Sequence, residues 1–304
     1  MKNIRIFATG ATTKDGIGLA MLLSFLRKIL LTSVGNLSFS VILAGSGRSE
    51  EKREATRNIA REIEGKFKAK VYCLHQDLSK SGAAERLMEQ IDDAVGEDPF
   101  DFVIDNAGFA DNEVFRKMKP ENIRDMMMLH MVEPTMLIFY LVERMHTRGR
   151  GTIIRTSSLL GLTPAPNHAP YGATKAFVNS LSYAMHIEEE IEKSGIQVVS
   201  VCFGPLDTEM INDAELYARI YNYFRIFVMK TTNAADIVAK AVLDGKQGLL
   251  IPGFRTKLLA LVRFLPQPIP ALTARYFMRN IPDGDPNLDR IWKIFGWFPK
   301  KNKE

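Results

Sequence analysis

The sequence predicts an α/β fold in which helices cover both faces of a doubly wound parallel sheet. Seven short apolar runs recur along the chain, and they do not alternate cleanly between apolar and polar residues, which is typical of strands buried on both faces. Longer helical patterns separate them, so right-handed crossovers are expected. The strands are expected at Ile4–Ala8, Val41–Ala44, Val71–Leu74, Phe102–Ile104, Thr152–Ile154, Val198–Cys202 and Leu249–Ile251, and the helices at Arg53–Ile63, Ala83–Val95, Glu121–Met145, Tyr171–Lys193 and Ala234–Leu243.

The chain is long enough for one large domain followed by an appendage. It has 304 residues, of which 46% are hydrophobic and 25% charged, the usual balance for a globular protein with a sizeable core. The strand and helix alternation ends near Gly253, which predicts a domain over residues 1–253. Residues 254–304 carry six prolines, both tryptophans and a basic end. That composition suits a helix lying at a membrane interface or a contact between subunits.

Composition and charge exclude several classes of protein. The net charge of +5 is modest and the basic residues form no stripe of the nucleic-acid-binding type, so no nucleic-acid partner is expected. Both cysteines, Cys73 and Cys202, lie in apolar strands and are interpreted as buried reduced thiols, with no metal site. No uncharged apolar run reaches the ~18 residues of a membrane-spanning helix, and the start lacks a signal peptide. A cytoplasmic protein is expected, with peripheral membrane contact left open.

The first predicted strand runs directly into a glycine turn, Thr9-Gly10-Ala-Thr12-Thr-Lys-Asp-Gly16-Ile17-Gly18. Glycines between a strand and a helix let backbone N–H groups approach a pyrophosphate, whose charge the helix N-terminus also favours. A purely structural turn is the alternative. The turn predicts a dinucleotide site formed by Gly10, Thr12, Gly16, Ile17 and Gly18.

The end of the second strand indicates which dinucleotide would bind. A site for NAD would carry an acidic residue here to hold the ribose 2′-hydroxyl, but none precedes Glu50. Instead Arg48, and Lys14 from the glycine turn, could bind a 2′-phosphate, with Arg as the better fork-shaped donor. The alternative is that both are ordinary surface cations. NADP(H) is therefore the expected cofactor.

Tyr171 and Lys175 lie one helical turn apart in YGATK and so share a helix face. A free tyrosine, with a pKa of about 10, is a poor base at neutral pH, but a neighbouring ammonium favours the phenolate. Ser158 follows the strand GTIIRTS and could polarise a substrate carbonyl from the edge of the sheet. A serine in this place is otherwise a common turn residue.

The order of these motifs, with Asp105-Asn106-Ala107-Gly108 after the fourth strand, resembles the short-chain dehydrogenase/reductase family over residues 3–253. The resemblance implies a Rossmann-type domain, in which Tyr171 is the acid/base, Lys175 lowers its pKa and binds the nicotinamide ribose, and Ser158 positions the carbonyl. Homo-oligomers are common in this family. The resemblance further assigns cofactor contacts to Asp77, Leu78, Asn106, Ala107, Gly108, Gly204, Pro205 and Thr208.

Three departures separate this chain from the family pattern. Its glycine motif is TG-x5-GIG, two residues longer than TG-x3-GIG. His130 stands where the family usually has an asparagine that joins the lysine to a water relay. It is assigned as a catalytic residue with pH sensitivity near its pKa of about 6.5, or otherwise as a packed core residue. Residues 19–40 are lengthened, and the addition is expected on the surface, away from the site.

The segment after Thr208 carries Met210 and several Tyr and Phe residues and resembles the lid that covers the substrate in this family. A lipophilic substrate such as a 3-oxoacyl chain, a steroid or a retinoid-like alcohol is predicted, although the same groups could simply pack into the core. The expected activity is NADP(H)-dependent hydride transfer between a carbonyl and an alcohol. The alternative is a catalytically impaired NADP(H)-binding scaffold or sensor, which the long glycine turn and His130 favour and the intact Ser158, Tyr171 and Lys175 oppose.

Overall fold

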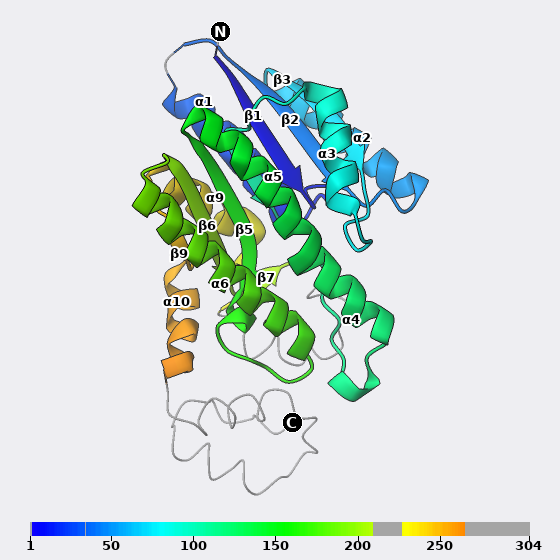
Figure 1. Ribbon diagram of the computed structural model, residues 1–304. Helices are drawn as coiled ribbons and strands as arrows, with labels where there is room; N and C mark the ends of the chain where they lie inside the picture. The colour runs from blue at the N-terminus through cyan, green and yellow to red at the C-terminus, as the bar shows by residue number, and fades with distance from the viewer. Residues whose placement is uncertain (1, 34, 209–226, 265–304) are drawn as a thin grey trace, which may run out of the picture.

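The computed structural model describes residues 2–33, 35–208 and 227–264. Seven parallel strands form one sheet in the order β3-β2-β1-β4-β5-β6-β9, with helices on both faces, which confirms the predicted doubly wound sheet (Figure 1). The chain order reverses direction between β1 and β4, and ligands bind such sheets at this switch point, beyond the carboxyl ends of the strands. The strands are β1 (Lys2–Thr9), β2 (Leu37–Gly45), β3 (Ala69–His75), β4 (Phe102–Asp105), β5 (Gly151–Ser158), β6 (Ile196–Phe203) and β9 (Gly248–Leu250).

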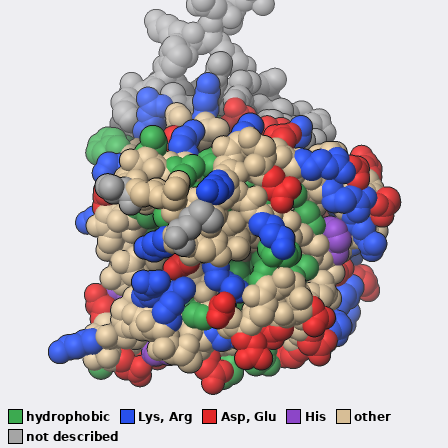
Figure 2. All heavy atoms as spheres, turned by 90° about the horizontal axis from the view of Figure 1, so that it is seen from above, with side chains coloured by type: hydrophobic (Ala, Val, Ile, Leu, Met, Phe, Trp, Pro, Cys, Tyr) green, Lys and Arg blue, Asp and Glu red, His purple; other side chains and the backbone are tan. Residues whose placement is uncertain are grey.

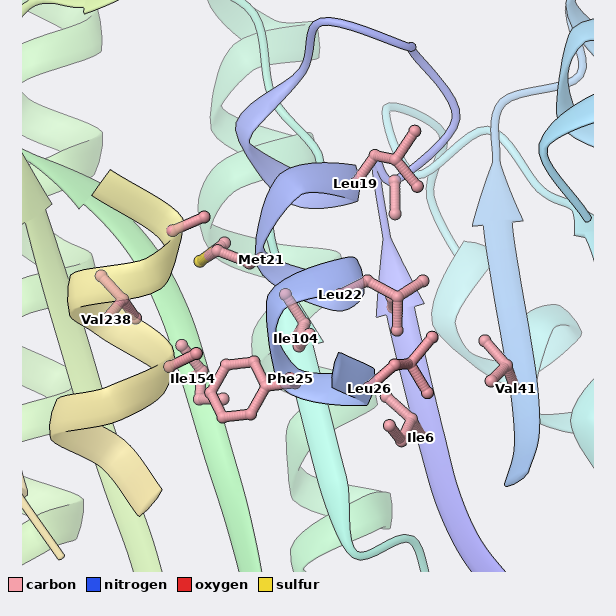
Figure 3. Close-up of a cluster of buried hydrophobic side chains, with 14 of the residues drawn as sticks. Ile6, Leu19, Met21, Leu22, Phe25, Leu26, Val41, Ile104, Ile154 and Val238 are labelled. Carbon is pink, nitrogen blue, oxygen red and sulfur yellow. The ribbon is translucent and has the colours of Figure 1, made fainter. Parts of the chain in front are cut away.

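Helices α1, α2 and α9 cover one face of the sheet, and α3, α5 and α6 cover the other, so each face has its own apolar core. On the first face, Leu22 and Phe25 of α1 lie over Ile6 and Ile104 of the sheet, with Val238 of α9 beside them (Figure 3). These helices are α1 (Ile17–Thr32), α2 (Glu50–Lys66), α3 (Ala83–Val95), α5 (Glu133–Arg148), α6 (Ala169–Glu192) and α9 (Thr231–Leu243).

The lengthened segment after the glycine turn lies mostly at the surface, as predicted. It extends α1 to Thr32, where Leu30 and Leu31 are exposed and Ile29 is buried in the core. The helical periodicity therefore continues through the added residues. Their place away from the site agrees with the prediction, because this end of α1 leads to the amino-terminal edge of β2.

One helix is interrupted by a wider turn that the sequence did not reveal. Between α4 (Pro120–Met127) and α5, residues Met128–Val132 form a π-helical turn, closed by a hydrogen bond from the Glu133 N–H to the Met128 carbonyl. Together the three segments form a 29-residue helix, Pro120–Arg148, which is long and apolar enough to cross a membrane by composition alone. Here α5 packs against α3 and the sheet, so this is a core helix of the domain.

The appendage begins with a helix that belongs to the domain. In α10 (Phe254–Ala260), Thr256 and Ala260 are buried, and a 3₁₀ turn, η4 (Leu261–Phe264), follows. The remaining short elements are η1 (Phe115–Lys117), η3 (Leu159–Gly161) and the two-stranded pair of β7 (Leu206–Asp207) and β8 (Met229–Lys230). At the amino-terminal edge of the main sheet, side chains of both charges are spread over the surface (Figure 2).

Candidate active site

The glycine turn packs directly against the turn that follows β4. Gly10 has a positive φ of 65°, and a Cβ there would lie 2.7 Å from the Ala107 Cα; a Cβ at Gly18 would collide with the Asn106 side chain. The Asn106 side-chain amide donates to the Gly10 carbonyl at 3.1 Å, while the Thr9 hydroxyl accepts the N–H groups of Asn106 and Ala107 at 3.0 and 3.1 Å. These contacts explain why the sequence has glycine at both positions.

The longer glycine turn remains compatible with a diphosphate. The Gly16 N–H bonds to the Thr13 carbonyl at 3.1 Å, and the Thr12 side chain lies against Gly45 at the end of β2. Helix α1 then begins at Ile17 with no side-chain cap and no acidic residue in its first turn. Its amino-terminal N–H groups and the positive end of its dipole suit an anion, so the residues present fit the pyrophosphate of a dinucleotide.

Arg48 and Asp77, predicted separately as cofactor residues, are bound to each other. The guanidinium donates to both carboxylate oxygens, at 2.8 and 3.0 Å, and to the Ser79 hydroxyl at 2.9 Å. Burial raises the pKa of Asp77, but the hydrogen bonds from Arg48 and from the Ser79 N–H outweigh it and lower the pKa to about 2. Leu78 is buried beside this pair, and Lys14 is in an exposed ion pair with Glu62 at 3.3 Å. Arg48 thus remains half-exposed at the carboxyl edge, but with its charge partly balanced.

Tyr171 and Lys175 occupy the first turns of α6, as the sequence predicted. The Lys175 ammonium lies 5.7 Å from the centre of the Tyr171 ring and donates to the Thr156 carbonyl at 3.0 Å. Burial lowers the pKa of Lys175 to about 8. At the other end of the same residue, the Lys175 carbonyl accepts a hydrogen bond from Ser157 at 3.0 Å. The strand β5 therefore holds this lysine at both its backbone and its charged tip.

Ser158 is the last residue of β5 and caps the turn η3, where its hydroxyl oxygen accepts the Leu160 N–H at 3.1 Å. This turn packs closely against α6. A Cβ at Gly172 would lie 2.9 Å from the Leu160 carbonyl oxygen, and one at Gly161 would lie 2.6 Å from the Lys175 carbonyl carbon. Glycine at both positions lets the serine-bearing turn lie against the helix that carries Tyr171 and Lys175.

His130 lies in the π-helical turn and contacts the tyrosine helix. Its Nε2 accepts the Phe109 N–H at 3.2 Å, so its Nδ1 carries the proton and donates to the Thr174 hydroxyl at 2.9 Å. The Thr174 hydroxyl in turn donates to the Tyr171 carbonyl at 2.8 Å, and the two rings meet edge-on at 5.8 Å. Burial lowers the pKa of His130 well below 6.5. The expected pH sensitivity near 6.5 is therefore wrong, because the ring is desolvated and neutral.

A second histidine, which the sequence analysis missed, borders the same tyrosine. His168 precedes α6 and is buried, its ring centroid lies 6.4 Å from that of Tyr171, and its Nδ1 donates to the Pro166 carbonyl at 3.0 Å. Burial also lowers the pKa of His168. Its place three residues before Tyr171 was the available signal, since that spacing sets one turn of helix between the two.

The predicted nicotinamide-side segment leads to the part of the chain outside the description. Gly204 faces the buried Thr256 of α10, since a Cβ there would lie 3.0 Å from the threonine methyl. The Pro205 carbonyl accepts the Met229 N–H at 3.0 Å, which pairs β7 with β8. Thr208 is the last described residue before the gap. The predicted substrate lid falls almost entirely on residues 209–226, outside the described residues.

A parallel sheet with a glycine turn at its switch point and a tyrosine–lysine helix two strands away defines a dinucleotide-binding oxidoreductase class. The model of the short chain dehydrogenase family matches residues 6–217, and the chain belongs to this family.

Relatives and solved structures of similar architecture agree with that assignment. The chain is 27% identical over 245 residues to an oxidoreductase of Listeria innocua, covering 80% of this chain and 91% of the relative. It is 24% identical to hydroxysteroid dehydrogenase-like protein 1 of Gallus gallus, covering 90% and 75% of the two chains. A short-chain dehydrogenase of Sphingobium yanoikuyae in complex with NADPH has a similar fold, with a TM-score of 0.65, 22% identity and coverage of 93% and 98%.

Proposed function

We propose that this oxidoreductase uses NADP(H) to interconvert a carbonyl and an alcohol, with Tyr171 as the proton donor and acceptor. The observation that carries the proposal is the arrangement on α6, where the Lys175 ammonium lies 5.7 Å from the centre of the Tyr171 ring and is fixed to the Thr156 carbonyl. A cation at this place favours the phenolate, which brings the proton transfer toward neutral pH. An ordinary surface tyrosine would have no such desolvated lysine beside it.

Each residue then has one task. Tyr171 gives its phenolic proton to the carbonyl oxygen during reduction and takes it back during oxidation. Ser158 lies on the turn packed against α6 and donates its hydroxyl hydrogen to the same oxygen, because its own oxygen already accepts the Leu160 N–H. His130 holds the tyrosine helix through Thr174 instead of titrating. When bound, the reduced nicotinamide supplies the hydride.

The preference for NADP(H) is supported by the lack of an acidic residue between the end of β2 and Glu50, and by Arg48 at the carboxyl edge. Arg48 is about half exposed, so its fork can exchange the Asp77 carboxylate for a 2′-phosphate. Gly10, Gly16 and Gly18 with the first turn of α1 would hold the pyrophosphate, and Asn106–Gly108 would line the ribose side. Asp77 and Leu78 would border the adenine, and Gly204, Pro205 and Thr208 the carboxamide.

The proposed substrate is a lipophilic ketone or alcohol. The aromatic composition of residues 209–226, with three tyrosines and one phenylalanine beside Met210, supports this class. Two relatives bear names of the same kind, the hydroxysteroid dehydrogenase-like protein already described and an acetoacetyl-CoA reductase of Rhizobium meliloti, 29% identical over 113 residues. A place in lipid metabolism is therefore part of the proposal.

We also propose a cytoplasmic homo-oligomer that makes peripheral membrane contact through residues 254–304. Exposed apolar side chains on the outer faces of α5 and α6, among them Phe139, Tyr183 and Ile187, support contact between subunits. Sedimentation of the full chain would give its mass in solution, and flotation with anionic vesicles would test the membrane contact. A monomer that stays with the soluble fraction would contradict both statements.

The central test is a fluorescence titration of the full chain with NADPH and NADH, repeated on Arg48→Ala, followed by turnover of a panel of steroid and 3-oxoacyl ketones. We expect tight NADPH binding that weakens about tenfold in the variant, as loss of one charge-assisted contact implies, with little change for NADH. Tyr171→Phe should bind NADPH normally and lose turnover by at least about a hundredfold. Normal binding without turnover of any ketone by the wild type would instead favour the non-catalytic NADP(H)-binding protein.

A further inference from the structure

An arginine–aspartate pair is buried beneath the tyrosine–lysine helix. Asp105 is the last residue of β4 and stands opposite Arg155 in the strand register. The Arg155 Nε donates to the Asp105 carboxylate at 3.0 Å, and the arginine side chain is 0% exposed. A charged residue inside a strand covered on both faces is costly, so it needs a physical reason to be there.

Only some of the polar atoms of this pair have hydrogen-bond partners among the described residues. Asp105 accepts one bond from Arg155 and a longer one, 3.4 Å, from the Thr9 hydroxyl. The Nη1 and Nη2 atoms of Arg155 find no hydrogen-bond partner among residues 2–33, 35–208 and 227–264. Because the site is desolvated, the field of this guanidinium and of its carboxylate reaches neighbouring groups with little screening by water.

The pair adjoins the anchor of Lys175. Thr156, whose carbonyl accepts the Lys175 ammonium, directly follows Arg155 in β5. Asn106, which follows Asp105, accepts a hydrogen bond from the Thr156 hydroxyl at 3.0 Å. The two charges are therefore joined through the backbone to the residues that hold the lysine and the glycine turn.

The other titratable groups around Lys175 are uncharged. Burial raises the pKa of Cys202 on β6 to about 11, and burial lowers the pKa of His130 in the π turn and of His168 before α6. Besides Tyr171 on its own helix, Asp105 and Arg155 are thus the charged groups of the described chain that act on this lysine. Asp105 favours its protonated form, and Arg155 opposes it.

We propose that Asp105 and Arg155 are positioning residues whose opposed charges set the pH at which the Tyr171–Lys175 pair exchanges its proton. Removing either charge shifts the titration of that pair, and the two removals shift it in opposite directions. Loss of the Asp105 negative charge favours release of a proton from Tyr171 or Lys175, whereas loss of the Arg155 positive charge favours retention. The direction is the same for either member of the coupled pair. This assignment deepens the proposed function of the same site.

The test reads Tyr171 directly and needs neither cofactor nor substrate. The ultraviolet absorbance of tyrosinate is titrated in the full chain, and the same titration of Tyr171→Phe is subtracted to isolate one of the eight tyrosines. We expect Asp105→Asn to lower the midpoint and Arg155→Met to raise it, each by about one pH unit, a tenfold change in proton affinity. The double variant should return close to the wild type, and Arg155→Lys, which keeps the charge, should remain near it.

Controls separate this role from a structural one. Arg148 and Asp101 form an ion pair, 3.3 Å apart, at the opposite edge of the same strands, so Asp101→Asn with Arg148→Met should affect stability but not the Tyr171 midpoint. If one single variant fails to fold, the other single variant is still compared with the double variant and with Arg155→Lys, both of which should keep the wild-type midpoint. The proposal is overturned if the folded single variants leave the midpoint unchanged or move it against the expected direction. Opposed shifts in a protein that reduces no ketone would keep this inference and defeat the proposed function.

Discussion

Two arginine–aspartate pairs lie at the same edge of the sheet, one on each side of the switch point, and they differ mainly in their access to water. Arg48 and Asp77 join β2 to β3 at 2.8 Å, with side chains 49% and 22% exposed. Arg155 and Asp105 join β4 to β5 at 3.0 Å, with exposures of 0% and 11%. We therefore propose different roles for two similar pairs: the solvated pair exchanges partners with an arriving anion, whereas the buried pair acts through its electric field.

Replacing each arginine in turn tests most directly whether burial makes the two pairs differ in their contribution to stability. Arg155→Met leaves Asp105 as a buried carboxylate without its partner, which should lower the free energy of unfolding by about 3–5 kcal/mol. Arg48→Met removes a solvated pair and should cost less than about 1 kcal/mol. Urea denaturation of both variants measures the difference. Equal losses would show that burial does not distinguish the pairs.

Adding Asp105→Asn to Arg155→Met removes both buried charges. Replacing a buried pair by uncharged groups is often close to neutral, so most of the lost stability should return. A double variant as unstable as the single one would indicate that the arginine acts through its packing instead of its charge.

A second buried carboxylate extends the comparison to helix ends. Glu133, at the start of α5, accepts the N–H groups of Gly82 and Ala84 at 3.0 and 2.7 Å and so caps α3 from another helix. Glu133→Ala leaves these donors unsatisfied, at about 1–3 kcal/mol each, so a loss of at least about 2 kcal/mol is expected. The exposed cap Ser49→Ala of α2 should cost only about 1 kcal/mol. Similar losses in thermal denaturation would contradict the role assigned to burial.

His130 provides a test of desolvation that depends on pH. Burial holds its folded pKa well below the unfolded value of about 6.5, so below that pH only the unfolded state gains the proton. The contribution of the neutral His130 to the free energy of unfolding is fully present above about pH 6.5. As the pH falls below that value, the free energy of unfolding decreases by about 1.4 kcal/mol per pH unit. His130→Asn should flatten this slope relative to the exposed His146→Asn, as measured by urea denaturation at several pH values. Identical slopes would mean that His130 is protonated in the folded protein.

The smallest expected effect concerns the solvated pair and rests on the proposed cofactor. Asp77→Asn removes the carboxylate that occupies the Arg48 fork, which should tighten NADPH binding severalfold relative to NADH, equivalent to about 1 kcal/mol. The exposed Glu62→Gln, which releases Lys14, is a matched control and should change selectivity less. Weaker binding of both nucleotides would instead show that Asp77 is needed to shape the adenine side.

The sequence was sufficient to predict the sheet, because strands that are buried on both faces appear in it as short apolar runs. It also placed Tyr171, Lys175 and Ser158 on adjoining elements, since fixed spacings determine helix faces and strand ends. The pairing of Arg48 with Asp77 was missed because the two residues lie in loops that follow different strands. Asp105 and Arg155 left one visible signal, a charge inside each of two buried strands. The tautomer of His130 depends on Phe109 and Thr174, which are distant in sequence and close only in the fold.

The wider turn at Met128–Val132 sets how α4 is rotated relative to α5. One extra residue in a turn rotates everything beyond it by about 100° relative to an unbroken α-helix. Deleting a single residue from this turn while α5 keeps its place on the sheet would therefore rotate the preceding turn, and could turn His130 away from Thr174. The wider turn thus lets two differently rotated segments both reach the body of the domain: α5 lies on the sheet, while α4 buries Met126 and pairs Asp125 with Lys80.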